Sequence, residues 1–397
     1  MEKKEEFIRV GTTLYKIVDQ PRIDGGYVRK RIAWNSETLR QDYGKDYMAS
    51  VPKYDGFCTV PDHVDYKPVV GKFLNLYEPI SHRPQEGDFP CIRSLVEHIF
   101  GEQYELGMDY LQLLYLYPIQ KLPILLLVSE ERNTGKSTFL NFLKAIFQNN
   151  VTFNTNEDFR SQFNSDWAGK LLIMVDEVLL NRREDSERLK NLSTTLSYKV
   201  EAKGKDRDEI GFFAKFVLCS NNEHLPVIID AGETRYWVRK IVPLKSDDTD
   251  FLQKLKTEIP AFLHFLQHRQ LSTGKESRMW FNPKLLETDA LRKIIRSNRN
   301  RLEIEMAELL LDIMASMDVE SVSFCLNDII PLLVCSQVKV EKSQVRKVVQ
   351  ECWKLTPASN SLSYTTYQCD YSRECGYSPV KRIGRYYTAS KAQLETF

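Results

Sequence analysis

A loop with the composition of a phosphate-binding site runs from Ser129 to Thr138. It reads Ser-Glu-Glu-Arg-Asn-Thr-Gly-Lys-Ser-Thr, after the apolar run Ile124–Val128 and before the helical pattern of Phe139–Leu143. A buried strand, a loop and a helix are the setting that a P-loop requires, because backbone N–H groups of the loop and of the helix N-terminus align on phosphate oxygens. The pattern predicts a site for the phosphates of ATP.

Three side chains of this loop are expected to contact the phosphates or Mg²⁺. Lys136 supplies a positive charge to the β- and γ-phosphates, Ser137 offers its hydroxyl to Mg²⁺, and Thr138 is a further phosphate contact. The standard pattern has glycine at the position of Glu130. A chance Gly-Lys-Ser-Thr at an ordinary loop-to-helix junction is the alternative. The expected nucleotide-binding residues are consecutive: Asn133, Thr134, Gly135, Lys136, Ser137 and Thr138.

Two acids follow a second apolar run, about 40 residues further along. Leu171–Val175 is typical of a parallel strand covered on both faces, and ligands bind at the carboxyl ends of such strands. Asp176 is therefore expected to hold Mg²⁺ with Ser137, and Glu177 to polarise the attacking water. The alternative is a strand that ends in a solvated acidic turn.

Two further residues complete the catalytic set. Asn221 follows the apolar run Phe216–Cys219, where an amide could bind the γ-phosphate or the attacking water, although the same residues also suit an ordinary loop start. Arg235, with Arg239 on the same face if the segment is a strand, could stabilise the transition state on a neighbouring subunit. The alternative places both arginines on the surface of a strand.

Composition limits the classes of protein that these residues could serve. The chain has 397 residues, 42% hydrophobic and 27% charged, with a formal net charge of +1. Nucleic-acid binding would therefore rely on local basic patches. Eight cysteines without a Cys-x-x-Cys pair indicate reduced thiols. The first residues lack the apolar core of a signal peptide, and no apolar run approaches the ~20 residues of a membrane span, so a cytoplasmic protein without a membrane partner is expected.

The periodicity of apolar residues predicts an α/β fold in several parts. Residues 1–95 show short strand-like alternations and carry no catalytic constellation, so their role is unknown. Residues 96–272 form the ATPase region, and its predicted elements are helices over 91–117 divided near Gly101, strands at 198–202 and 212–218, and a helix over 251–271. Residues 273–300 are a basic connector, and 301–397 are a small domain of helices followed by strands.

The order of these motifs resembles that of a superfamily 3 helicase, and more narrowly the helicase part of phage and mobile-element primase–helicase proteins. The segment Glu258–Leu266 is similar to the helix that follows the ATPase core in that family. The likeness covers roughly residues 95–270. The motifs that carry it are Gly135-Lys136-Ser137-Thr138, Val175-Asp176-Glu177, a basic turn, Ser220-Asn221-Asn222 and Arg235.

The resemblance implies an AAA+-like P-loop ATPase that acts as a ring, expected to be a homo-hexamer, with ATP bound between subunits. Arg235 matches the arginine that acts on the neighbouring subunit. Lys203, Lys205 and Arg207 match a hairpin that contacts single-stranded or forked DNA in the central channel. A solvated turn is the alternative, because nearby acids almost cancel the charge. The family's primase domain is absent, so priming would need a separate primase. The chain itself is expected in the cytoplasm of a bacterial host cell.

Two basic features near the end of the chain leave alternatives open. The segment 290–302 contains five cations and no acid, and it either binds DNA or is a solvated linker. Helices followed by a basic, aromatic hairpin, with strands expected at 363–369 and 382–388, suggest a winged-helix-like domain, which family members often carry at this end. A small packing or oligomerisation domain is the alternative.

Three functional hypotheses follow. The first is an ATP-driven DNA helicase acting in the replication of a phage or mobile element. The second is a nucleotide-dependent DNA-binding loader or assembly factor that does not unwind DNA. The third is a catalytically silent paralogue, which the glutamate at position 130 makes conceivable.

Overall fold

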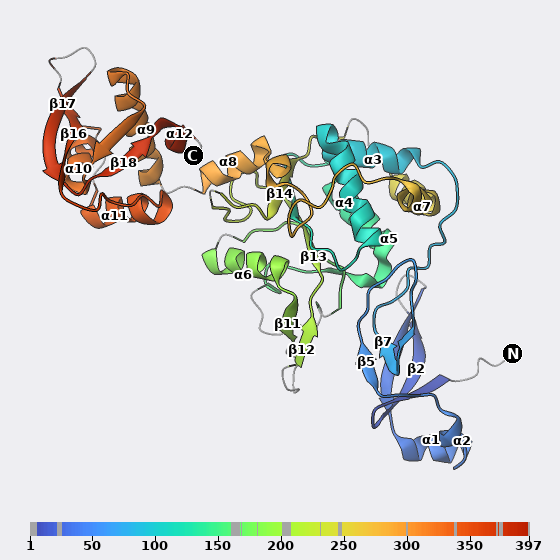
Figure 1. Cartoon of the computed structure of the whole chain (residues 1–397). Coiled ribbons are helices and arrows are strands. Elements are labelled where there is room, and N and C mark those ends of the chain that lie inside the picture. Colours follow the sequence, from blue (N-terminus) through green and yellow to red (C-terminus); the bar gives the residue numbers. More distant parts are fainter. Residues whose placement is uncertain are drawn as a thin grey trace. The chain divides into compact units, whose positions relative to one another are not determined.

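The computed structural model describes residues 6–21, 26–159, 167, 169–180, 182–200, 208–230, 232–244, 248–298, 301–336, 340–370, 372 and 376–395. The chain forms two compact units (Figure 1). The first contains Met1–Val227 and Thr234–Leu291, and the second contains Ile228–Glu233 and Arg292–Phe397.

A five-stranded parallel sheet forms the centre of the first unit, in the order β14-β8-β13-β10-β9. In β8, all five residues, Ile-Leu-Leu-Leu-Val, are buried, as expected for a parallel strand covered on both faces. The α/β class and the strands predicted around 124–128 and 171–175 are confirmed. The strands are β8 (Ile124–Val128), β9 (Val151–Phe153), β10 (Leu172–Val175), β13 (Lys215–Ser220) and β14 (Tyr236–Lys240).

Four helices pack together beside this sheet (Figure 1). They are α3 (Pro90–Phe100), α4 (Tyr104–Leu116), α5 (Lys136–Phe147) and α7 (Phe251–His268), with the short helices η1 (Gly101–Gln103) and η2 (Gln148–Asn150). The predicted break near Gly101 is confirmed, since that glycine has a φ of +49°. Every residue from Leu106 to Tyr115 is buried, which makes α4 a central helix of the core.

A helix and a hairpin lie between β10 and β13 in the sequence. Helix α6 (Arg183–Thr194) leads into β11 (Ser197–Val200), which pairs with β12 (Asp208–Gly211). The strand that we expected over 212–218 is therefore placed wrongly at its start. Residues 212–214 are a buried connection into β13, and an apolar run alone does not distinguish such a connection from a strand.

The N-terminal region of the first unit is rich in strands, as its alternating pattern predicted. One sheet has the order β3-β2-β1-β4, and a smaller one has the order β5-β7-β6. Phe7, Leu14, Leu39 and Val51 form a small core between the first sheet and its helices. The elements are β1 (Glu6–Val10), β2 (Thr13–Pro21), β3 (Tyr27–Trp34), α1 (Ser36–Tyr43), α2 (Tyr47–Ser50), β4 (Lys53–Tyr54), β5 (Gly56–Cys58), β6 (Val69–Val70) and β7 (Phe73–Asn75).

Beyond α7, the region expected to be a connector contains helices. These are η4 (Pro283–Leu286) and α8 (Asp289–Ser297), and α8 carries the first cations of the basic segment. Among the helices that the structure describes, none is long and apolar enough to cross a bilayer.

The second unit combines helices with two pairs of antiparallel strands, β15 with β18 and β16 with β17. Asp328, on the helix Leu326–Cys335, links this helix to the hairpin of β16 and β17. Its carboxylate accepts hydrogen bonds from Tyr364 and Arg382 on the two strands of that hairpin. The strand expected over 382–388 is two strands interrupted at Arg385 and Tyr386. The elements are α9 (Arg301–Met317), β15 (Ser321–Phe324), α10 (Leu326–Cys335), α11 (Lys342–Lys347), η5 (Val348–Cys352), β16 (Leu362–Cys369), β17 (Tyr377–Gly384), β18 (Tyr387–Ser390) and α12 (Lys391–Glu395).

Candidate nucleotide site

The carboxyl ends of three neighbouring strands carry most of the residues that the sequence singled out. The phosphate loop follows β8 and enters α5 at Lys136, Asp176 and Glu177 follow β10, and Asn221 follows β13. Because β8, β13 and β10 are adjacent and parallel, these ends lie at one edge of the sheet. We call it the carboxyl edge.

The backbone of the phosphate loop explains why Glu130 is tolerated. Left-handed φ angles occur at Asn133 (+54°) and Gly135 (+81°), and these two residue types adopt that region most readily. Glu130 has no such angle. Its backbone N–H donates to Oε1 of Glu223 at 3.2 Å, so this position uses its main chain and does not require glycine.

Lys136 lies beneath the loop, with only 6% of its surface exposed. Its amino group donates to Oγ1 of Thr134 at 3.1 Å. Burial lowers the pKa of Lys136, and the carboxylates of Asp176 and Glu177 are among the groups that oppose this effect. The lysine is therefore held at the helix N-terminus among negative charges, as a phosphate-binding cation would be.

Ser137 and Asp176 meet directly across the carboxyl edge. The serine hydroxyl donates to Oδ2 of Asp176 at 2.7 Å. A hydroxyl and a carboxylate are the hard oxygen ligands that Mg²⁺ prefers, and Mg²⁺ usually takes only one or two protein ligands besides water and phosphate. Among the described residues, no group of three or more His, Cys, Asp and Glu side chains is placed to hold a metal ion by itself. The pair fits a magnesium ion that arrives with a nucleotide.

Glu177 has a left-handed backbone with a φ of +61°, which is uncommon for a glutamate. Asn156 stabilises this turn, since its Nδ2 donates to the carbonyl of Glu177 at 3.2 Å and its Oδ1 accepts from the N–H of Leu179 at 2.9 Å. Nδ2 of Asn221 donates to Oε1 of Glu177 at 3.3 Å. The Glu177 carboxylate, next to Asp176 in the sequence, is thus directed toward Asn221, the residue predicted to bind the γ-phosphate or the attacking water.

Contacts from outside the phosphate loop hold it in place, and no pattern in the sequence predicts them. Glu223 is 3% exposed, and its carboxylate accepts from Nζ of Lys240 at 3.0 Å as well as from the loop. This hydrogen bond raises the pKa of Lys240. In addition, Nε2 of His98 lies 3.0 Å from the carbonyl of Thr134. The only available signal was an acid two residues after Asn221, and no motif marks it.

The structure does not bring Arg235 to these residues. It precedes β14, and its carbonyl accepts from the N–H of Ile124, the first residue of β8. Arg235 therefore lies at the amino edge of the sheet, opposite the phosphate loop. Arg239 is buried, with Nη1 2.6 Å from Oε1 of Glu102 and 2.8 Å from Oε1 of Gln103. This engagement within the chain gives Arg239 a structural role.

The three cations expected to contact DNA, Lys203, Lys205 and Arg207, lie outside the described residues. The strands that flank them in the sequence, β11 and β12, pair from Ser197 opposite Gly211 to Val200 opposite Asp208. Their role stays a prediction.

Comparison with known proteins supports the fold. Residues 127–236 match a family described only as "Family of unknown function (DUF5906)". No curated protein matches the chain. A structure of the NrS-1 C-terminal region in its apo form aligns over 94% of both chains, at 17% identity and a TM-score of 0.63. A second apo structure of that region covers 89% of this chain and 84% of its own, at 19% identity and a TM-score of 0.59. At these identities the likeness establishes a similar fold and nothing further.

Proposed function

We propose that the chain is a Mg²⁺-dependent ATP hydrolase that acts as a DNA helicase in the replication of a phage or mobile element. One observation carries the proposal: the Ser137 hydroxyl is hydrogen-bonded to Asp176 at 2.7 Å, directly beside a buried lysine and a carboxylate bound by an asparagine. A lysine, a hydroxyl and two carboxylates at the carboxyl edge of a parallel sheet are the groups that phosphoryl transfer from Mg·ATP requires.

The residues of the chain divide the chemistry of hydrolysis. Backbone N–H groups of the phosphate loop and the ammonium of Lys136 bind the phosphates. Ser137 and Asp176 would hold Mg²⁺, which when bound neutralises charge on the phosphate oxygens. Glu177 polarises the attacking water and accepts its proton, while Asn221 orients the Glu177 carboxylate through the contact at 3.3 Å.

A neighbouring subunit completes the site in this proposal. Arg235 lies at the amino edge, whereas Lys136 and Glu177 lie at the carboxyl edge of the same sheet. Arg235 therefore acts on ATP bound by an adjacent copy, in an AAA+-like ring that we expect to be a homo-hexamer. Hydrolysis then moves the hairpin cations Lys203, Lys205 and Arg207 along single-stranded DNA.

The Glu177→Gln variant tests the chemical step. The amide preserves the shape and the contact with Asn221 but accepts no proton, so ATP turnover should fall by about 10²–10⁴-fold. Binding of a fluorescent ATP analogue should stay within about twofold, since the phosphate-binding groups are unchanged. Glu308→Gln, an exposed carboxylate on α9 in the other unit, is the matched control. Normal turnover by the Glu177 variant would remove this residue from the mechanism.

Strand displacement from a forked DNA substrate tests the helicase activity. The proposal predicts ATP-dependent displacement by the unchanged chain and none by Glu177→Gln. ATP turnover that single-stranded DNA stimulates without displacement would instead support a loader or assembly factor.

A further inference from the structure

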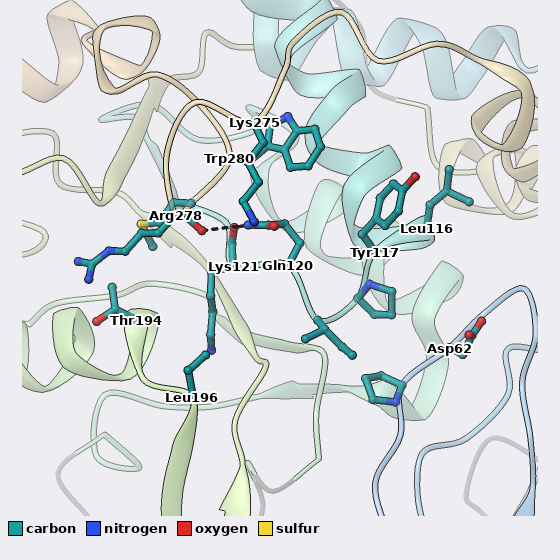
Figure 2. A pocket seen from close by; sticks show the side chains of 14 residues that line it. Asp62, Leu116, Tyr117, Gln120, Lys121, Thr194, Leu196, Lys275, Arg278 and Trp280 are labelled. Carbon is teal, nitrogen blue, oxygen red and sulfur yellow. Dashed lines mark hydrogen bonds between the residues drawn. The ribbon is translucent and has the colours of Figure 1, made fainter. Parts of the chain in front are cut away.

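A cavity of about 660 Å³ opens at the amino edge of the sheet, away from the nucleotide site (Figure 2). Its walls come from four segments of the first unit: residues 61–62, 116–121, 194–196 and 275–280. The side chains that matter most are two aromatic rings, three cations and one exposed leucine. They are Tyr117, Trp280, Lys121, Lys275, Arg278 and Leu196.

We propose that this cavity binds a nucleotide unit of single-stranded nucleic acid, with the base on the aromatic rings and the phosphate on the cations. The inference rests on the proposed function, because it gives the translocated strand a second contact beyond the hairpin.

The aromatic surface suits a nucleobase. The rings of Tyr117 and Trp280 are stacked, with centroids 6.4 Å apart and an angle of 19° between their planes. Tyr117 remains 52% exposed, so the pair presents aromatic surface to solvent. Nε1 of Trp280 donates to Oγ1 of Thr273 at 3.1 Å, which fixes the ring. Bases stack on such rings without sequence preference because every base has a π-face.

The charges around the cavity suit a phosphate. Lys121 is only 9% exposed, and its amino group donates to the carbonyl of Phe212 at 2.6 Å. Behind it, the buried amino group of Lys215 donates to the carbonyl of Pro118. Burial lowers the pKa of both lysines, that of Lys121 to about 8, and the charge of Lys121 lowers that of Lys215 further. Within the described part of the chain, neither amino group has a carboxylate partner.

The rim adds to this positive excess. Lys275 and Arg278 are exposed, and the described residues provide no ion pair for either side chain. The acid in the lining is Asp62, whose Oδ1 accepts hydrogen bonds from the backbone N–H groups of Val64 and Asp65, each at 2.8 Å. Three cations against one acid make an anionic ligand favourable, and buried cations gain most from it.

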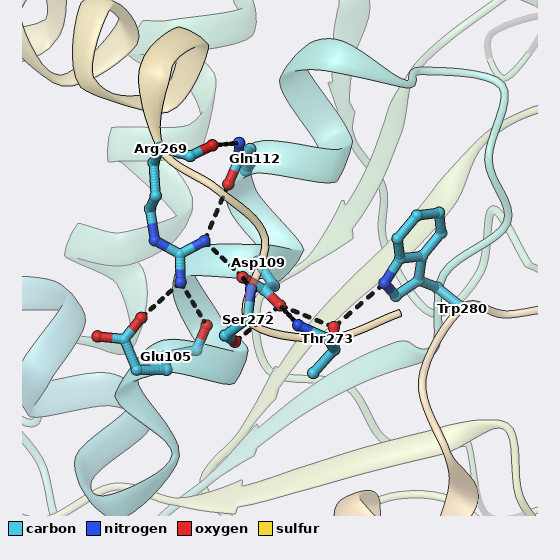
Figure 3. Close-up of polar contacts among 7 residues, drawn as sticks. All are labelled: Glu105, Asp109, Gln112, Arg269, Ser272, Thr273 and Trp280. Carbon is cyan, nitrogen blue, oxygen red and sulfur yellow. Dashed lines mark hydrogen bonds and ion pairs between the residues drawn. The ribbon is translucent and has the colours of Figure 1, made fainter. Parts of the chain in front are cut away.

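The loop that carries Lys275, Arg278 and Trp280 is held in place before any ligand binds (Figure 3). The carboxylate of Asp109 on α4 is fully buried and accepts from Arg269. The same carboxylate accepts from both the N–H and the hydroxyl of Ser272 and of Thr273, at 2.7–3.0 Å. On the cavity side, Nε2 of Gln120 donates to the carbonyl of Arg278 at 2.9 Å. A fixed wall lowers the entropy lost on binding.

The position of the cavity favours a single strand over a free nucleotide. Leu196 forms part of the wall and directly precedes β11, the first strand of the hairpin expected to contact DNA. Its side chain is 78% exposed. The cavity therefore adjoins the base of the hairpin, where a nucleic-acid strand bound along the hairpin can reach it.

Binding of a fluorescein-labelled oligo-dT to the full chain, measured by anisotropy at several salt concentrations, tests the inference. The double variant Lys275→Glu/Arg278→Glu should weaken binding at least about tenfold, and the slope of log K against log salt should become shallower by about 1.4, or 0.7 for each phosphate contact. Tyr117→Ala should weaken binding by about tenfold with an unchanged slope, since stacking carries no charge. Lys284→Glu, at an exposed cation that does not line the cavity, is the matched control and should bind as the unchanged chain does.

Each other outcome overturns the inference in a recognisable way. If the unchanged chain binds the oligonucleotide and unwinds a fork, but the cavity variants bind with the same affinity and slope, the cavity is not a contact and the proposed function stands. If the unchanged chain does not bind the oligonucleotide, both proposals fail. If the variants lose self-association while each subunit binds DNA normally, the cavity is an interface between copies. Thermal melts of all variants establish that they are folded.

Discussion

Lysines are buried at both edges of the central sheet, but different groups surround their charges at the two edges. At the carboxyl edge, Lys136 lies among the carboxylates of Asp176, Glu177 and Glu223, which oppose the effect of burial on its pKa. At the amino edge, the amino groups of Lys121 and Lys215 donate to backbone carbonyls and have no carboxylate partner among the described residues, and the charge of Lys121 lowers the pKa of Lys215 further.

This difference suits different ligands. Mg·ATP brings its own cation, so a site that already contains acids beside a lysine can accept it without a large charge imbalance. A cavity lined by cations without matching acids instead favours an anion that arrives without a metal, such as a backbone phosphate. We therefore expect substitutions at the two edges to have separate consequences.

The largest expected effect comes from Asp109, which fixes the loop at the amino edge. Asp109→Asn leaves the buried guanidinium of Arg269 without its main partner and should lower the free energy of unfolding by about 3–5 kcal/mol. Glu105→Gln, which removes the exposed carboxylate bound to the same arginine, should cost less than about 1 kcal/mol. Urea unfolding at pH 7 measures both, and equal effects would contradict the role given to the buried acid.

The pH dependence of Asp109 gives an internal check on that measurement. Although burial raises its pKa, hydrogen bonds from Ser272, Thr273 and Arg269 outweigh this effect and keep the pKa below the usual value of 3.8. A carboxyl with a lowered pKa in the folded chain stabilises the fold above its unfolded pKa, and this contribution is lost as pH falls through the folded pKa. The difference between the unchanged chain and Asp109→Asn should therefore shrink only below about pH 4.

An intermediate effect is expected from Lys121, and it sharpens the contrast between the edges. With a folded pKa of about 8 against the ordinary 10.5, the folded chain binds fewer protons than the unfolded chain between these values. Stability therefore rises with pH in that window. Lys121→Met should remove about 1–2 kcal/mol of this rise between pH 8 and 10. Lys256→Met, at an exposed lysine of α7, should leave the rise unchanged in urea titrations, and an equal loss in both variants would refute the assignment to Lys121.

The smallest expected effect is at the carboxyl edge. Glu223→Gln keeps an oxygen that can accept from the N–H of Glu130 but loses the charge that binds Lys240. Replacing a charged acceptor by a neutral one costs about 1 kcal/mol, so KM for ATP should rise about fivefold with little change in kcat. Steady-state ATP hydrolysis measures both constants. A fall in kcat at constant KM would place Glu223 in the chemical step.

The parts of the site that are local in sequence could be predicted, and the parts that depend on distant contacts could not. Ser137 could be predicted from the Gly-Lys-Ser-Thr motif between an apolar run and a helical pattern, and Asp176 from its place at the end of an apolar strand pattern. Nothing in the sequence indicated that Glu223 binds the N–H of Glu130, because an isolated acid in a loop has no spacing to recognise. The internal role of Arg239 was missed for the same reason, as Glu102 lies on another element.

The same limits apply to the fold and to the amino edge. The apolar run from Phe212 to Leu218 was read as one strand because hydropathy does not separate a buried connection from a strand. In the sequence, Lys121 looks like an ordinary surface residue, and Lys215 is an isolated lysine within the run Phe212–Leu218. Only their burial in the folded chain distinguishes them.

The glutamate at position 130 also has a consequence for the unfolded chain. In the unfolded chain, a glycine at this position would adopt positive and negative φ angles about equally, whereas a glutamate is largely restricted to negative φ. Because the native conformation of Glu130 lies outside the left-handed region, the side chain restricts the unfolded ensemble without a steric cost in the folded loop. Relative to glycine, closing the phosphate loop should therefore cost less conformational entropy, by about 0.4–1 kcal/mol at room temperature.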